Sequence, residues 1–161
     1  RAIEIAFPSE DPEQRSISEA VQAMWERVLG VPVGLRTVEG KVLSSFIREL
    51  DYDVARSNWF GDYMDPSTFL DLFVTGSGQN RTGWSNAEYD RLIAAAAAEA
   101  DNARRYGLFA QAERILCAEE VPILPTFYRR GNYLLRPGFE GIHDNVRDLL
   151  QIHRVRRGGG E

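Results

Sequence analysis

The chain has 161 residues, with 19 basic and 24 acidic side chains, a formal net charge of −5 and a hydrophobic content of 43%. This length and composition suit one domain with a core of its own. The acidic balance argues against general binding to nucleic acid, which needs clustered basic residues. The basic cluster Arg154, Arg156 and Arg157 is expected to be a solvated end of the chain.

A single cysteine, Cys117, excludes an internal disulfide and a cysteine-based metal cluster. No apolar run approaches the ~20 residues that a membrane-spanning helix needs.

The first part of the chain predicts a strand followed by a helix. Residues 1–7 alternate apolar and polar side chains, as a strand does, so we expect the natural amino terminus to lie upstream. Turn residues 8–12 then precede a helix that ends at Gly30 and Pro32. Apolar residues at three- and four-residue steps predict the core-facing stripe of this helix: Ile17, Ala20, Val21, Met24, Trp25 and Val28.

The same pattern then repeats once. Residues 31–38 predict a second strand, residues 42–50 a second amphipathic helix, and residues 52–60 a third strand. Strands joined by helical crossovers pair in parallel. We therefore expect an α/β fold with a small, mostly parallel βαβαβ sheet in the order 2-1-3, flanked by helices.

Helices dominate the next part of the chain. Asp65 and Pro66 predict the start of a short helix, and residues 75–83 form a Gly-rich loop that lacks the Lys-Ser/Thr ending of a phosphate loop. Residues 85–88 have the capping-box spacing and open a long helix. A second long helix ends at Val121-Pro122 and carries one apolar stripe, and we expect the two helices to pack as a hairpin against the sheet. The members of that stripe are Tyr106, Phe109, Ala112, Ile115 and Leu116.

The pattern weakens towards the carboxyl end. Residues 123–128 and 133–135 predict two strands, with Pro125 indicating an edge or a bulge. Beyond Arg136, residues 139–145 are loop-like, and residues 149–155 offer at most one short strand.

The residues for catalysis or metal binding are poorly placed. His143 and His153 both lie in the weakly patterned tail, and no Gly-x-Ser-x-Gly elbow occurs. Asp62, Asp65 and Asp71 match no loop pattern of calcium or magnesium ligands, and Asp65 is better explained as a helix cap. We therefore expect no enzymatic activity, no metal and no cofactor.

A corner between the third strand and the short helix carries the best candidates for ligand binding. Polar side chains at the carboxyl end of a strand can face a crevice without disturbing the core. Asp62 could pair with an ammonium group beside Trp59, and Arg56 could hold a carboxylate by two parallel hydrogen bonds. Two local alternatives stay open, because Asp62 could bind turn amides and Arg56 could pair with Asp53.

This corner resembles a known family. Residues 53–70, with the sequence Asp-Val-Ala-Arg-Ser-Asn-Trp-Phe-Gly-Asp-Tyr-Met-Asp-Pro-Ser-Thr-Phe-Leu, are similar to the matching stretch of bacterial family 5 extracellular solute-binding proteins. These proteins are the oligopeptide- and dipeptide-binding components of ABC importers. Further similar stretches occur in the family's order, so that the resemblance covers nearly the whole chain. They are residues 20–25 with 29–31, 84–90, 112–116 with 120–123, and 133–134.

The resemblance implies a periplasmic-binding-protein-like lobe. Residues 1–136 would be the carboxy-terminal lobe of a two-lobed receptor, and residues 137–161 a tail that returns to an amino-terminal lobe missing from this chain. The implied ligand contacts are Asp62 for an α-amino group, Arg56 for a carboxylate, Trp59 as the neighbouring aromatic, and Asn58 and Tyr63 from the same motif.

The implied function is the capture of a peptide and its delivery to the transmembrane subunits of an ABC permease. The receptor would act in the periplasm or on the outer face of the cytoplasmic membrane, with a lipid anchor as one means of attachment. A non-peptide ligand of the same family, such as an oligosaccharide, an opine or a nickel complex, is the alternative. A hydrolase or a standalone interaction domain is a more distant one.

Overall fold

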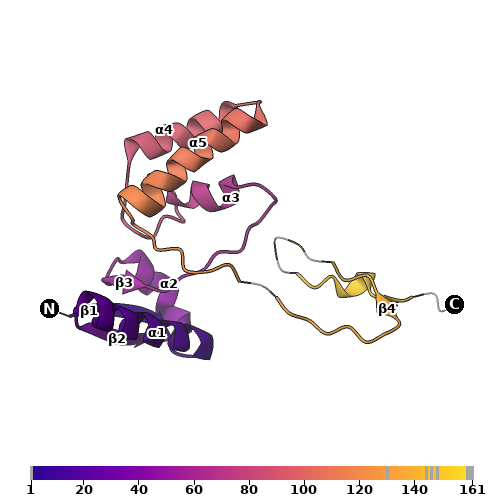
Figure 1. The fold of residues 1–161 in the computed structure, drawn as a ribbon, viewed down its shortest axis with the longest axis horizontal. Coiled ribbons are helices and arrows are strands. Elements are labelled where there is room, and N and C mark those ends of the chain that lie inside the picture. The colour runs from indigo at the N-terminus through magenta and orange to yellow at the C-terminus, as the bar shows by residue number, and fades with distance from the viewer. Residues whose placement is uncertain (1, 130, 144, 146, 148, 159–161) are drawn as a thin grey trace. The chain divides into compact units, whose positions relative to one another are not determined.

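The computed structural model describes residues 2–129, 131–143, 145, 147 and 149–158, and the chain divides into two compact units (Figure 1). The first unit comprises Arg1–Asn58 and Gly78–Trp84, and the second comprises Trp59–Ser77 and Ser85–Glu161. Arg1 of the predicted first strand, Asp144 of the predicted loop 139–145, and residues 146, 148 and 159–161 of the predicted tail fall outside the described residues.

A three-stranded parallel sheet forms the centre of the first unit. Its strands are β1 (Ile3–Pro8), β2 (Val33–Val38) and β3 (Val54–Ala55), in the order β2-β1-β3, so the predicted topology is confirmed. Ile3 lies opposite Val33 in the register of the two longer strands. The central strand is inaccessible to solvent at three successive residues, as expected for a parallel strand covered on both faces. These are Ile5, Ala6 and Phe7.

The third strand is much shorter than the predicted span of residues 52–60, and its partner explains why. The Arg56 amide donates to the carbonyl of Ala6, with an N–O distance of 2.8 Å. The next bond of a parallel ladder would come from the amide of residue 8. Residue 8 is a proline and has no amide hydrogen, so the pairing stops there.

Two helices pack against the sheet of the first unit. Helix α1 (Pro12–Leu29) contacts β1 and β2, and α2 (Gly40–Arg48) contacts β1. The Asp11 carboxylate caps α1 by accepting hydrogen bonds from the amides of Glu13 and Gln14. As predicted, α1 ends at Gly30, which has a φ of 66° in the left-handed region.

The buried face of α1 differs from the predicted apolar stripe. Helix α1 buries Gln14 and Ser18, and the Ser18 hydroxyl donates to the Gln14 carbonyl at 2.7 Å, so its burial is satisfied. Trp25, expected in the core, is half-buried, and Val28 is 70% exposed. The apolar spacing identified the helix correctly but did not identify which face is covered in this unit.

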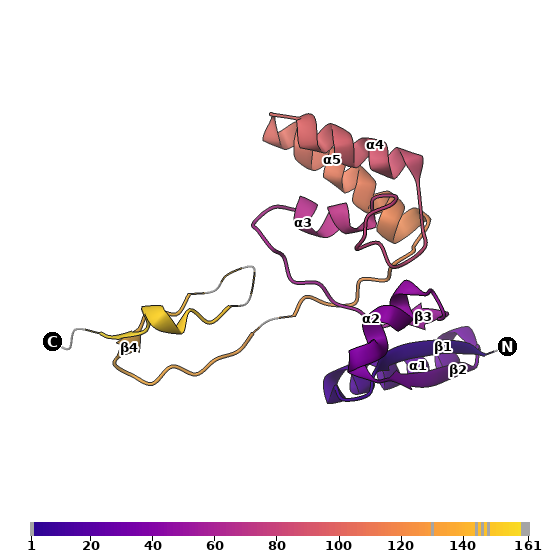
Figure 2. The same cartoon turned by 180° about the vertical axis from the view of Figure 1, so that it is seen from behind.

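A helical hairpin forms the centre of the second unit. Helices α4 (Ala87–Ala98) and α5 (Asn102–Arg114) lie side by side in both views, and α5 continues into the π-helical turn η2 (Ile115–Glu119) (Figures 1 and 2). The predicted hairpin is therefore confirmed. Its contact with the sheet stays a prediction, because the sheet belongs to the other unit. The core of the hairpin contains Tyr89, Leu92, Ala96, Phe109, Ala112 and Leu116.

Details of the hairpin correct the sequence interpretation at two points. The side chain that caps α4 is Asn86, which accepts from the Tyr89 amide at 2.9 Å, rather than Ser85 of the predicted capping box. Tyr106, expected on the buried stripe of α5, is 52% exposed. The short helix predicted after Asp65 is confirmed as α3 (Ser67–Leu70), followed by the 3-10 turn η1 (Asp71–Phe73).

The carboxyl part departs most from expectation. The described residues of 123–128 and 133–135 form no strand, so both strand predictions are wrong. Pro122 and Pro125 remove backbone donors, and the described side chains there, such as Tyr128 and Leu134, are exposed. Instead, β4 (Phe139–Glu140) pairs antiparallel with β5 (Arg156–Arg157). The 3-10 turn η3 (Ile152–Arg154) lies within the strand expected at residues 149–155 and replaces its centre, and the boundary after Arg136 stays a prediction.

Candidate functional site

The predicted site residues fall in both units. Arg56 and Asn58 belong to the first unit, and Trp59, Asp62 and Tyr63 belong to the second. Arg56 and Asn58 line a cavity of the first unit and Asp62 lines a cavity of the second, whereas Trp59 and Tyr63 line neither of these two cavities.

Local hydrogen bonds hold the loop that carries Asp62. The Asp62 amide donates to the Thr68 hydroxyl at 2.9 Å, and Thr68 is buried at the start of α3. The residue at the N-cap of α3 is Pro66 rather than the predicted Asp65, but the Asp65 carboxylate still accepts from the Ser67 amide at 3.0 Å. Its carboxylate also forms a two-pronged ion pair with Arg105, with N–O distances of 2.5 and 2.7 Å. The Arg105 guanidinium holds the pKa of Asp65 well below its ordinary value.

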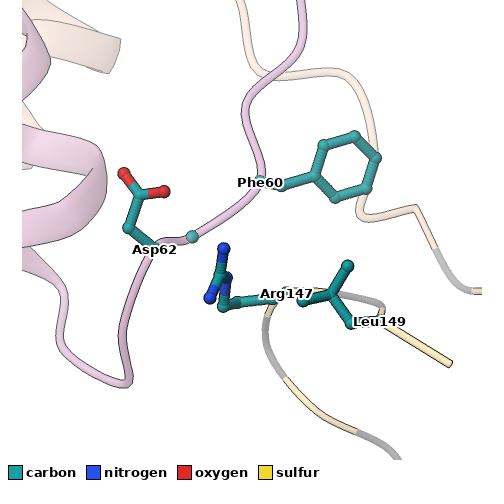
Figure 3. Close-up of a pocket in the computed structure, with 5 residues that line it drawn as sticks. Phe60, Asp62, Arg147 and Leu149 are labelled. Atoms are coloured by element: carbon teal, nitrogen blue, oxygen red, sulfur yellow. The ribbon is translucent and has the colours of Figure 1, made fainter. Parts of the chain in front are cut away.

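Asp62 differs from Asp65 in having no such partner. Its side chain is exposed, and among the described residues its carboxylate has no hydrogen-bond or ion-pair partner. It lines an open cavity of about 340 Å³ together with Phe60, Gly61, Arg147 and Leu149 (Figure 3). The alternative in which turn amides occupy this carboxylate is therefore not seen in the described part of the chain.

Two aromatic residues close to Asp62 in the sequence, Trp59 and Tyr63, have side chains that are accessible to solvent. Trp59 is 38% exposed and Tyr63 is 49% exposed, and the Tyr63 hydroxyl shares a hydrogen bond of 3.2 Å with that of Ser67. The Phe60 ring and the Asp62 carboxylate leave the loop in different directions (Figure 3). Phe60 is the aromatic residue that lines the cavity with Asp62, whereas Trp59 and Tyr63 are not lining residues. A carboxylate and an aromatic ring that line one cavity are suited to an ammonium group, which both attract.

Arg56 lines a second cavity, of about 190 Å³, in the first unit. It lies where β1 and β3 end, which is the carboxyl edge of the parallel sheet. The Arg56 Nε donates to Gln14 Oε1 at 3.2 Å, and burial lowers the pKa of the guanidinium, which stays charged at any physiological pH. Asp53 accepts from the Glu4 amide at 3.1 Å, and its pairing with Arg56 stays open as an alternative. The complete lining is Pro8, Asp11, Gln14, Leu43, Ser44, Ile47, Arg56, Ser57, Asn58 and Arg81.

Arg81 was not identified from the sequence. It belongs to the Gly-rich loop 75–83, and the hydroxyl of Tyr52 donates to its backbone carbonyl. Its Nε is buried and has no hydrogen-bond partner in the described chain. A lone arginine in a glycine-rich loop was the available signal, but the contact that brings this loop to the cavity depends on the fold.

Histidine and cysteine side chains are absent from the described lining of both cavities. Among the described residues no group of three His, Cys, Asp or Glu side chains could hold a metal ion. His143 and His153 line neither cavity. Burial raises the pKa of the Cys117 thiol, which makes it a weaker nucleophile. No helix in the described ranges has the length and apolar character to cross a membrane.

Comparison with known proteins finds relatives that are described as binding proteins. The chain is 40% identical over 134 residues to the dipeptide-binding protein DppE of Bacillus subtilis, covering 83% of this chain and 24% of DppE. It is 34% identical to Escherichia coli YgiS, described as a "Probable deoxycholate-binding periplasmic protein", over 76% of this chain and 23% of YgiS. The structure of the Escherichia coli murein tripeptide binding protein MppA matches with a TM-score of 0.86 and 29% identity, over 97% of this chain and 30% of MppA.

These matches support the fold and the family predicted from the motif at residues 53–70. The chain spans about a quarter of the length of the curated relatives that it matches. The solved structure confirms a periplasmic-binding-protein-like fold. Residues 1–81 match the family model for the middle part of "Bacterial extracellular solute-binding proteins, family 5". The chain belongs to this family of extracellular solute-binding proteins.

Proposed function

We propose that this chain supplies one lobe of a two-lobed peptide receptor that serves an ABC importer outside the cytoplasmic membrane. One observation carries the proposal: the Asp62 carboxylate lines an open cavity and has no partner among the described residues. The dipeptide- and murein-tripeptide-binding relatives support peptides as the ligand class. Periplasmic placement and attachment by a lipid anchor are parts of the same proposal.

The chemistry of the proposed site is binding without turnover. Asp62 accepts charge-assisted hydrogen bonds from the α-ammonium group of the peptide, and Arg56 offers a guanidinium to a carboxylate. Trp59 and Tyr63 add apolar surface next to the ammonium group. The peptide lies between this lobe and the remainder of the receptor, and closure of the lobes around it signals the permease.

A non-peptide ligand is the second candidate. The 34% identity to YgiS, described as deoxycholate-binding, favours it, because the family includes a relative described as taking a ligand without an amino group. The two candidates differ in what they need from Asp62. A peptide uses its negative charge, whereas an acidic steroid would be repelled by it.

The test uses a receptor that contains this chain at the full length of the family. Asp62→Asn keeps the shape of the side chain and removes its charge. We expect it to weaken binding of a peptide with a free amino terminus by about 1.5–3 kcal/mol, because a hydrogen bond to a charged group is lost. Titration calorimetry with the free and the amino-acetylated peptide measures the difference, and the acetylated peptide should bind equally to both proteins.

A matched control removes the same charge elsewhere. Asp51 is exposed, pairs with Arg36 at 3.4 Å and lines neither cavity, so Asp51→Asn should leave both affinities unchanged. Equal losses for the free and the acetylated peptide in Asp62→Asn would contradict the ammonium role. Tight binding of deoxycholate without binding of any peptide would favour the second candidate.

A further inference from the structure

We propose that Arg81 acts with Arg56 as a doubly cationic pocket that selects peptides carrying an acidic side chain next to their terminal carboxylate. This inference rests on the proposed peptide-binding function and names the kind of peptide. It concerns the cavity of the first unit, where both arginines are lining residues.

Basic residues outnumber acidic residues in the lining of this cavity. Its charged lining residues are Asp11, Arg56 and Arg81. The Asp11 carboxylate is engaged by the amides of Glu13 and Gln14 at the start of α1. Arg56 donates through Nε to an uncharged amide, that of Gln14. Two of the three charged lining residues are therefore basic, and the other polar groups of the lining, such as Ser44 and Asn58, are neutral.

Arg81 lines the cavity with one of its donor groups unpaired. Several arginines elsewhere in the described chain pair with carboxylates, among them Arg36, Arg91 and Arg105. The Nε of Arg81 is buried without a hydrogen-bond acceptor, which costs stability in the unliganded protein. A carboxylate that enters the cavity can pair with the guanidinium of Arg81, which lines it. A guanidinium and a carboxylate form two parallel hydrogen bonds, so each arginine can hold one carboxylate group.

The loop holds Arg81 in a fixed backbone position before any ligand arrives. The Tyr52 hydroxyl binds the Arg81 carbonyl. On either side, the side-chain amide of Asn80 donates through Nδ2 to the Trp84 carbonyl at 3.0 Å, and the Thr82 hydroxyl donates to Asn80 Oδ1 at 2.8 Å. A site whose backbone is already ordered loses less entropy on binding. A cavity of about 190 Å³ is also small, which suits one short acidic side chain better than a bulky residue.

The experiment compares closely matched peptides on the full-length receptor. The peptides Ala-Ala-Glu and Ala-Ala-Gln differ in one charge, and Glu-Ala-Ala carries that charge away from the terminal carboxylate. We expect the receptor to prefer Ala-Ala-Glu over both others by about tenfold or more. Arg81→Gln should reduce the affinity for Ala-Ala-Glu by about tenfold and that for Ala-Ala-Gln by less than about twofold. Arg81→Lys keeps the charge but not the planar guanidinium group. Its affinity for Ala-Ala-Glu should lie between those of the unsubstituted receptor and of Arg81→Gln.

Two controls separate a binding role from a structural one. Arg48→Gln removes a charge from an exposed residue of α2 outside the cavity and should change none of the affinities. The Tm of the unliganded Arg81→Gln receptor should not fall, because the substitution removes a buried donor that has no partner. A lower Tm together with equal losses for all three peptides would show that Arg81 only supports the fold.

The outcomes also distinguish this inference from the function on which it rests. If Asp62→Asn weakens peptides with a free amino terminus but the receptor treats Ala-Ala-Glu and Ala-Ala-Gln alike, only the role of Arg81 is wrong. If Glu-Ala-Ala binds as well as Ala-Ala-Glu, the cavity does not select an acidic side chain at the carboxyl end of the peptide, and the inference is again wrong. If no peptide binds, both proposals are wrong.

Discussion

Two aspartates three residues apart, Asp62 and Asp65, have opposite surroundings in this protein. Asp65 accepts the Ser67 amide and pairs with Arg105, whereas the Asp62 carboxylate lines an open cavity. The same side chain is thus structural at one position and available at the other. Asp65 and Arg105 are 40 residues apart in the chain, so their pairing depends on the packing of α5 beside the loop.

Asp65→Asn is expected to make the unfolding of the chain less sensitive to acid. The pKa of Asp65 is lowered in the folded state, so its contribution to stability is fully present above the ordinary aspartate pKa of about 4 and is lost as the pH falls below it. The variant should be less stable than the natural chain near neutral pH, and the difference should shrink progressively below about pH 4. Urea unfolding followed by circular dichroism over a series of pH values measures both curves.

An exposed ion pair provides the comparison for this prediction. Glu88 pairs with Arg91 at the surface of α4, and Glu88→Gln should change stability little because solvent screens such pairs. A constant difference between the natural chain and Asp65→Asn at every pH would contradict the assignment of the effect to the lowered pKa.

At the scale of elements, apolar periodicity together with Gly, Pro and capping residues predicted which segments are helices and strands. It did not predict how far each element extends or which face is covered. The order β2-β1-β3 and the α4–α5 hairpin follow from local patterns that the structure confirms. The end of β3 could not be predicted from its own residues, because it depends on the neighbouring Pro8. The segments 123–128 and 133–135 have strand-like composition, yet composition does not supply the partner that a strand requires.

The candidate site shows the same division. Asp62, Trp59 and Arg56 lie in one contiguous motif and were predicted from it. Arg81 reaches the cavity through a loop that Tyr52 holds in place, and this contact spans 29 residues of sequence. Local patterns carry no information about such a contact, so this residue could be identified only from the fold.

Helix α5 contains a glycine whose replacement should stabilise it. Gly107 lies inside α5, and a Cβ added there would meet no atom within 4 Å. Gly107→Ala should raise the free energy of unfolding by about 0.5–1 kcal/mol, because alanine loses less backbone entropy in a helix. Thermal and urea unfolding measure the change.

Gly30 supplies a control of opposite sign. A Cβ there also meets no atom within 4 Å, but Gly30 has a φ of 66°. Gly30→Ala should therefore lower the free energy of unfolding by about 1 kcal/mol through backbone strain alone. Stabilisation by both substitutions, or by neither, would contradict this explanation.

At the scale of the whole molecule, the candidate ligand contacts are divided between two units that the chain enters more than once. The first unit holds the cavity with Arg56 and Arg81, and the second holds the cavity with Asp62. In the proposed receptor the peptide also contacts a lobe outside these 161 residues. Affinity is then a property of the complete receptor, since each surface supplies only part of the contacts.

The 161-residue chain alone is therefore expected to bind peptide weakly or undetectably. Calorimetry should show no binding at micromolar peptide concentrations, whereas the receptor of full family length should bind under the same conditions. Micromolar binding by the chain alone would mean that it holds a sufficient site without a second lobe.

The proline at the end of β1 has an influence beyond the strand that it closes. By lacking an amide hydrogen, Pro8 fixes the point at which the neighbouring chain leaves the sheet, and Arg56 is the residue at that point. A residue with an amide hydrogen at position 8 could supply the next hydrogen bond of the ladder and draw Arg56 into the regular pleat. If Arg56 binds the ligand as proposed, a substitution at position 8 is expected to alter ligand preference, although the side chain of Pro8 has no charge and no hydrogen-bonding group.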